Sequence, residues 1–185
     1  MTNGIKLCCL CLLICQLSGS LLSAAKQAPP APIPAPILAA KRIFIANAGW
    51  DTPFYYPALF SGGSTRAYDQ FYAAMKSWGR YELVASPSDA DLIVQVQFTV
   101  YVPPEVRTGN QAGLFNIPPY DAQFRVEIRD PKSNALLWAF VEHAEQAILQ
   151  VNRDKNFDLA LGRIVGDVQV LGAEPPAAPD STAKP

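Results

Sequence analysis

Residues 91–102 read DLIVQVQFTVYV, the longest strict alternation of apolar and polar residues in the chain. Alternation of this kind places every second side chain on one face of a β-strand. Only Ile93 breaks the pattern, and the residues expected to face a core are Leu92, Val94, Val96, Phe98, Val100 and Val102. The stretch therefore predicts a long strand in a sheet that has one buried face and one polar face.

A second alternating segment follows at residues 121–129, where apolar side chains again occupy every second position. The next segment, DPKSN at 130–134, is typical of a turn, because proline fixes φ and asparagine tolerates a left-handed backbone. Residues 135–142 then return as the other strand of a hairpin. Upstream, the segments 41–48 and 81–84 predict two shorter strands.

Two segments have helical periodicity. Residues 64–78 place five large apolar side chains on one helical face, with Ser64 or Thr65 as cap and Gly79 as terminator. Residues 155–171 repeat this spacing, and Gly172 follows them. The expected order is β-α-β-β-β-β-α. It predicts an α+β fold, a two-layer sandwich in which two amphipathic helices cover one face of a mainly antiparallel sheet of about five strands.

The two ends of the chain differ from this central part. Lys6 precedes an apolar run from Leu7 to Leu22 that contains all four cysteines, and small residues follow at 23–25. We expect residues 1–25 to be a signal peptide, with an uncleaved membrane anchor as the alternative. Export to the periplasm or the extracellular space would then leave a chain without thiols.

Proline and alanine dominate residues 26–40 and 173–185, which predicts a disordered linker and a disordered tail. We therefore expect a single folded domain at residues 41–172. This part carries twelve Lys or Arg and fourteen Asp or Glu, a net charge of minus two with interspersed signs. Nucleic acid is excluded as the expected partner, because no basic stripe is available to neutralise phosphates. Membrane contact is expected only if the signal peptide is uncleaved.

The element order, together with the segments YELV, SDADLIVQVQF and FRVEIRDPKSNALLWAF, is similar to small α/β domains of bacterial envelope proteins. These include the amino-terminal domain of the Tol-system β-propeller protein, the curli-secretion channel protein and exported families of unknown function. The resemblance implies a role in envelope assembly or scaffolding rather than catalysis.

No catalytic constellation can be assembled from the sequence, and no cofactor or metal is expected. His143 is the only histidine, so it has no second histidine for a zinc site, and we expect it to be a partly exposed residue at the end of a strand. Residues 152–158 alternate oxygen-bearing side chains like the start of a calcium loop, but Phe157 stands where glycine is required. We interpret this segment as a cap for the last helix.

Two segments remain as candidate binding sites. Gly62, Gly63, Ser64 and Arg66 lie between a strand and a helix start, where backbone amides can bind an anion. The other candidate is a set of aromatic residues in two proline-containing loops, at 49–63 and 101–120. These residues are Trp50, Phe54, Tyr55, Tyr56, Phe60, Phe115 and Tyr120. Clustered surface aromatics anchor interfaces, although the rings could instead form a satellite core.

The leading hypothesis is an exported, non-enzymatic envelope protein that acts as a binding or scaffolding module through the aromatic loops. Its partner would be an envelope protein or a cell-wall component. One alternative is a small-ligand or anion-binding domain that uses the helix start at Gly62–Arg66. The other is an exported hydrolase, which would need a carboxylate pair such as Asp51 and Asp121.

Overall fold

The computed structural model describes residues 31–51, 59–103 and 119–173. The chain divides into two compact units, residues 1–32 and 33–185. Every helix and strand in the described ranges belongs to the second unit, which is treated by itself.

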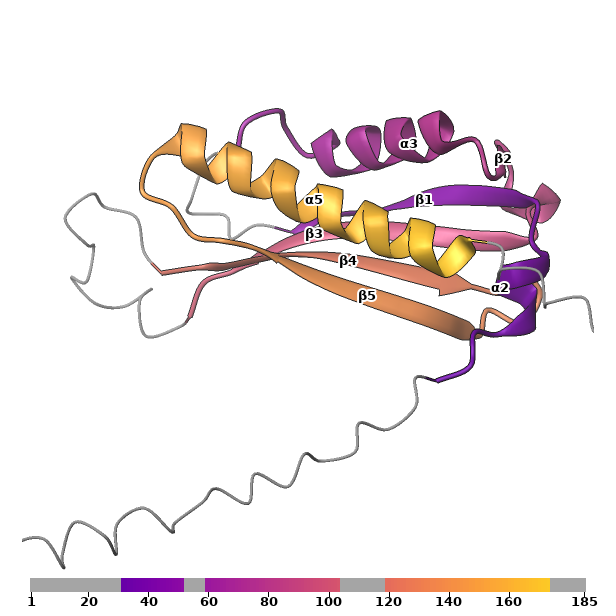
Figure 1. Ribbon diagram of the computed structural model, residues 1–185. Coiled ribbons are helices and arrows are strands. Elements are labelled where there is room, and N and C mark those ends of the chain that lie inside the picture. The colour runs from indigo at the N-terminus through magenta and orange to yellow at the C-terminus, as the bar shows by residue number, and fades with distance from the viewer. Residues whose placement is uncertain (1–30, 52–58, 104–118, 174–185) are drawn as a thin grey trace, which may run out of the picture. The chain divides into compact units, whose positions relative to one another are not determined.

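The second unit has two layers, in which the two long helices lie on the same side of an open five-stranded sheet (Figure 1). This confirms the predicted α+β two-layer sandwich. In chain order the elements are α2 (Ala35–Ala39), β1 (Arg42–Asp51), α3 (Arg66–Trp78), β2 (Glu82–Leu83), the 3-10 helix η1 (Pro87–Asp89), β3 (Leu92–Tyr101), β4 (Asp121–Arg129), β5 (Leu136–Ala144) and α5 (Gln150–Gly172).

The strands are arranged in the order β2-β1-β3-β4-β5, so β2 and β5 form the two edges. β1 pairs in parallel with β2 and with β3, whereas β3–β4 and β4–β5 are antiparallel. The sheet is therefore mixed, and its antiparallel half contains the two longest pairings. A register shift lies between Asn47 and Trp50, where β1 continues beyond the predicted strand.

The alternation in β3 matches its burial, because every second residue from Leu92 to Val100 is buried. On the helical layer, α3 contributes Ala67, Phe71 and Met75 to the core. The residues that α5 buries include Phe157, Ala160, Ile164 and Val168. Gly79 ends α3 with a φ of 70°, as the sequence predicted.

The core also includes residues from the segment 26–40, which the sequence analysis placed in a disordered linker. Residues 35–39 form the short helix α2, in which Ile37 is only 1% exposed, and Ala40 is 2% exposed. The sequence did not predict α2, because a single buried isoleucine among prolines and alanines produces no helical periodicity. The packed unit thus begins before residue 41.

Helix α5 is longer than predicted, since it begins at Gln150 rather than near residue 155, and it ends with Gly172 inside the helix. Gly172 lies close to the residues that follow α3. A Cβ atom at this position would lie 2.5 Å from the Tyr81 hydroxyl oxygen and 2.9 Å from the Trp78 ring. The glycine thus allows this close approach and does not mark the end of the helix.

Candidate functional site

Two members of the predicted aromatic surface belong to the core instead, and a third packs against it. Phe60 and Tyr120 are 3% and 2% exposed. Trp50 is partly buried, with its ring centroid 4.6 Å from that of Phe98 and 5.8 Å from that of Phe157. These rings close one end of the sandwich, so they provide no open binding surface. Their burial follows from β1, which carries Trp50 on to the end of the sheet where the sequence had predicted a loop.

The other four aromatic positions are Phe54, Tyr55, Tyr56 and Phe115, and they lie outside the described residues. Their part in binding stays a prediction. Among the described residues nearby, Tyr101 at the end of β3 is 57% exposed.

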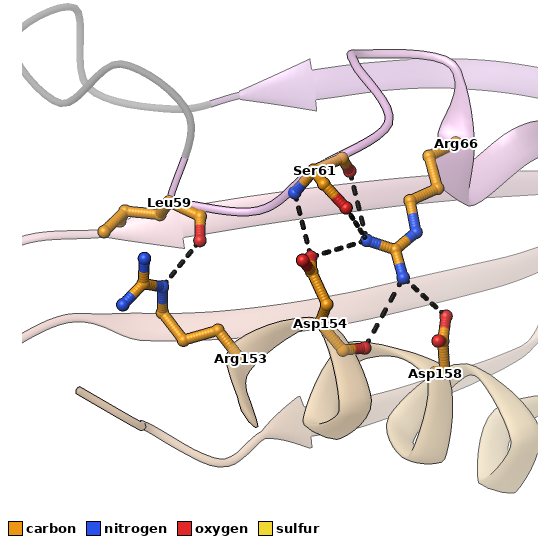
Figure 2. A network of polar contacts seen from close by, with 6 residues as sticks. All are labelled: Leu59, Ser61, Arg66, Arg153, Asp154 and Asp158. Carbon is orange, nitrogen blue, oxygen red and sulfur yellow. Dashed lines mark hydrogen bonds and ion pairs between the residues drawn. The ribbon is translucent and has the colours of Figure 1, made fainter. Parts of the chain in front are cut away.

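The predicted anion site is occupied by the protein's own carboxylates. The Arg66 guanidinium donates to Asp154 Oδ1 and to Asp158 Oδ1, at 2.7 Å in each case (Figure 2). It also donates to the Ser61 carbonyl oxygen at 3.0 Å and lies 4.2 Å from the centroid of the Phe157 ring. Only 10% of the Arg66 side chain is exposed. The cation expected to bind a ligand therefore fastens α3 to α5.

Gly62 has a role in this packing. Its φ is 88°, and a Cβ atom would lie 2.7 Å from Arg66 Cδ. Gly63 also has a positive φ, and helix α3 begins at Arg66 after Thr65. The Gly62–Gly63–Ser64 segment thus shapes the turn that lays Arg66 over α5 rather than cradling an anion.

A second arginine fastens the same loop to α5. Arg153 is 7% exposed, and its Nε donates to the Leu59 carbonyl oxygen at 2.6 Å (Figure 2). Its Nη1 donates to the carbonyl oxygens of Ala147 and Ile148. Three main-chain carbonyls therefore solvate this buried charge. Sequence reasoning missed Arg153, because a lone arginine in a polar segment gives no signal of burial.

Asp154 joins both halves of this network. Its Oδ1 accepts a hydrogen bond from the Ser61 N–H at 2.8 Å in addition to the bond from Arg66. Burial alone would raise the pKa of the Asp154 carboxyl, but the bonds from Ser61 and Arg66 outweigh burial and hold the pKa below its usual value.

The predicted capping cluster does not cap α5, because the helix starts several residues earlier. Asp154 and Asp158 bind Arg66, and Asn156 Nδ2 donates to the Glu145 carbonyl oxygen at 3.0 Å. Within the described residues, no group of three or more His, Cys, Asp or Glu side chains could hold a metal ion.

His143 lies near the end of β5, as predicted. Its Nδ1 is 2.7 Å from Asp121 Oδ1, and both side chains are at least half exposed. Asp121 is the first residue of β4. Its structural neighbour is thus the histidine. Asp51 is the last residue of β1.

The sheet face opposite the helices carries a row of charges along β4. Glu127 accepts hydrogen bonds from Arg125 Nε at 2.7 Å and from Arg129 Nη2 at 2.6 Å, and Arg129 Nε also donates to Gln95. The bonds from Arg129 and then Arg125 lower the pKa of the Glu127 carboxyl despite its desolvation. These charges are paired with one another, so the face is polar without being strongly charged.

The β5 edge differs from this polar face. Its first six residues read LLWAFV, and Leu136 and Val141 are 47% and 48% exposed. Arg163 of α5 reaches the far end of the strand, where it donates to Glu142 Oε2 at 2.7 Å and to the His143 carbonyl oxygen at 2.8 Å. An uncharged edge strand is a template for pairing with another strand. The structure therefore makes this edge the strongest candidate surface among the described residues.

A shallow cleft of about 430 Å³ lies between α2 and the β4–β5 turn. Asp91 at its rim accepts hydrogen bonds from the N–H groups of Lys41 and Arg42, and these bonds lower the pKa of its carboxyl. Asp130 is likewise held by the N–H groups of its own turn. The acids of this cleft hold the protein backbone, so it gives no indication of a ligand.

No family model matches the chain, and no curated protein matches it. Similar solved structures include a PelC dodecamer from Paraburkholderia phytofirmans, with 12% identity and a TM-score of 0.44 over 75% of this chain and 95% of that chain. A putative neuraminyllactose-binding hemagglutinin homolog from Helicobacter pylori shows 10% identity and a TM-score of 0.44, over 75% and 89% of the two chains.

A third similar structure is the uncharacterized lipoprotein B from Nitrosomonas europaea, with 14% identity and a TM-score of 0.36 over 78% of this chain and 89% of that chain. The three proteins are not the Tol-system or curli-secretion proteins that the sequence resembles, and that finer resemblance stays a prediction. Because all three TM-scores are below 0.5, these likenesses carry no argument about function.

None of the helices in the part of the chain that the structure describes is both long and apolar enough to cross a membrane.

Proposed function

We propose that this protein is an exported, non-enzymatic domain of the bacterial envelope that acts as a binding or scaffolding module, and that its binding surface is the β5 edge. The observation that carries the proposal is the uncharged run Leu136–Val141 on a nine-residue edge strand. Strands with this character bind other strands through main-chain hydrogen bonds, and their side chains add specificity. The apolar leader at residues 7–22 supports the assignment to the envelope.

The charge distribution supports a neutral protein surface as the partner. The long cationic side chains nearest to β5 are engaged by acids, since Arg163 binds Glu142 while Arg125 and Arg129 bind Glu127. A polyanionic ligand would have to displace these acids from their arginines. An extended peptide backbone needs only the main-chain groups of β5 that have no partner among the described residues.

Site-specific photo-crosslinking in the exporting cell tests this proposal. A photoreactive side chain at position 141 lies next to the cross-strand side chain of a bound strand, whereas one at position 151 lies on an exposed part of α5, where Val151 is 70% exposed. We expect protein adducts from position 141 and none from position 151. Equal adducts from both positions, or none from position 141, would contradict the proposed function. Fractionation of the same cells tests export.

A further inference from the structure

The main-chain groups that β5 turns outward can be identified from its hairpin with β4. The Asp130 N–H donates to the Ala135 carbonyl oxygen at 3.0 Å, so residue 130 directs its backbone groups toward the β5 side of the hairpin. In an antiparallel ladder this direction alternates along each strand. The even residues of β4 therefore bond to β5, and their register partners include Phe140 and Glu142. The odd residues of β5, from Ala139 to His143, turn their backbone groups away from β4.

An independent contact agrees with this assignment. The His143 carbonyl oxygen accepts a hydrogen bond from Arg163 Nη2 at 2.8 Å, as an outward-facing carbonyl can. Within residues 31–51, 59–103 and 119–173, this is the only side-chain hydrogen bond made to the outer edge of β5. Arg163 thus closes the edge at His143 and leaves the backbone groups of Ala139 and Val141 open.

Natural proteins usually guard such an edge with lysine, proline, a bulge or an inward-pointing charge. Here residues 136–141 contain no charge and no proline. The register shift between Ile128 and Arg129 lies at the start of the strand and leaves residues 138–144 in regular pairing. The regular and unguarded part of the edge is therefore the part that turns Ala139 and Val141 outward.

We propose that β5 pairs in antiparallel fashion with β5 of a second copy of this chain, an inference that rests on the proposed function and names its partner. The register that uses the open groups of both copies is centred on Phe140. In this register Ala139 forms a hydrogen-bonded pair with Val141 of the second copy, and the reciprocal pair forms across the two-fold axis. Such an interface is isologous, so it closes as a dimer.

In this register the edge can pair with itself without opposing two large side chains at 139 and 141 or two like charges. On the polar face the register places a small side chain, Ala139, opposite the larger Val141 in both reciprocal pairs. Glu142 falls opposite Trp138, and its carboxylate is already bound to Arg163 at 2.7 Å. No like charges meet within residues 136–142. The net charge of minus two at residues 41–172 adds little repulsion between copies.

Sedimentation equilibrium of the purified exported protein tests the pairing with three variants. A139K/V141K places two lysines opposite each other twice across the axis, whereas A139K/V141E places lysine opposite glutamate at the same positions. V151K adds a lysine to an exposed valine away from β5. We expect the wild type and V151K to dimerise at about 100 μM, A139K/V141K to weaken dimerisation at least tenfold, and A139K/V141E to restore most of it.

A wild type that sediments as a monomer at this concentration overturns the pairing, and so does a dimer that A139K/V141K leaves intact. Thermal melts of both double variants show whether the monomer fold is kept. Because A139K/V141E carries the same lysine at position 139, a dimer restored in this variant shows that the loss in A139K/V141K comes from charge repulsion and not from misfolding. The photo-crosslinking result is separate. A monomer that still forms adducts of another mass at position 141 would retain the proposed function and reject the second copy as partner.

Discussion

Two regions of the molecule involve α5 but differ in how their polar groups are bound. One is the α3–α5 junction, formed by Arg66, Arg153, Asp154 and Asp158, and the other is the β5 edge. At the junction, the Arg66 guanidinium and the buried Arg153 guanidinium are bound on several sides by carboxylates and carbonyls. At the edge, the backbone groups of Ala139 and Val141 turn away from β4 and have no partner among the described residues. The polar groups of the junction thus have their hydrogen-bond partners within the domain, whereas those of the edge are available to another strand.

This difference shows where function should be sought in a domain of this kind. Glycines and an arginine before a helix have the form of a ligand site, yet in this protein they hold two helices together. The apolar strand β5 contains no chemical motif, and its capacity to bind arises from its position at the edge of the sheet. The place of a strand within the sheet depends on the topology, so the amino-acid composition of β5 alone cannot show that it lies at an edge.

The largest expected effect is at Phe60, one of the aromatic residues for which the sequence left both a binding surface and a satellite core open. Replacing Phe60 by Ala should lower the free energy of unfolding by about 3–5 kcal/mol, because the ring is buried and a cavity would remain. Denaturant unfolding measures this, with Tyr101→Ala as the exposed aromatic control, expected within about 0.5 kcal/mol. Similar small losses in both variants would return Phe60 to the binding surface.

A smaller loss is expected when the junction loses its cation. Arg66→Met should reduce stability by about 1–3 kcal/mol, because Asp154 and Asp158 would keep their charges without their main partner. Arg125→Met is the matched control, since the Arg125 side chain is half exposed and pairs on the open face. An unchanged melt for Arg66→Met would show that the junction does not depend on this ion pair.

The junction should also weaken in acid. The pKa of Asp154 in the folded protein lies below its unfolded value of about 3.9, so its stabilisation is present above that pH and is lost as pH falls through the folded pKa. Asp154→Asn should therefore cost about 1–2 kcal/mol at neutral pH and flatten the pH dependence below about 4. Unfolding curves at several pH values check this. Asp167→Asn, an exposed position on α5, controls for the change in net charge; an equal flattening there would contradict the assignment.

The smallest effect on stability is expected at the edge. A139K/V141K should change the free energy of unfolding of the monomer by no more than about 0.5 kcal/mol, because both side chains are exposed and point away from the helices. A denaturation series at low protein concentration measures the monomer alone. A large loss of stability would mean that Ala139 and Val141 contribute to the packing of the monomer. The β5 edge would then not differ from the junction in the way described.

The sequence contained enough to predict the layers and most of the elements. β3, β4, α3 and the β4–β5 hairpin follow directly from periodicity, because burial on one face imposes the alternation that the residues show. The parallel pairing of β1 with β3 was not predicted, since it joins residues far apart in the chain. Ile37 in α2 was missed for a related reason, because a single buried side chain leaves no period.

The candidate site was harder to predict. Trp50, Phe60 and Tyr120 have the composition of an interface, and only the continuation of β1 shows that they close the core. Arg66 has the right place and charge to bind an anion, but the carboxylates that neutralise it come from α5, nearly ninety residues later. Long-range pairing of this kind is invisible to local patterns.

The hairpin turn at residues 130–134 has a consequence for how a newly made chain folds. Its contacts are local, so β4 and β5 can form within about 1–10 μs, whereas the β1–β3 ladder must bring Ile43 to Leu92 across a long intervening chain. β5 can therefore pair with β4 before the rest of the sheet has formed. At high local concentration, completion of one domain thus competes with aggregation with the next chain.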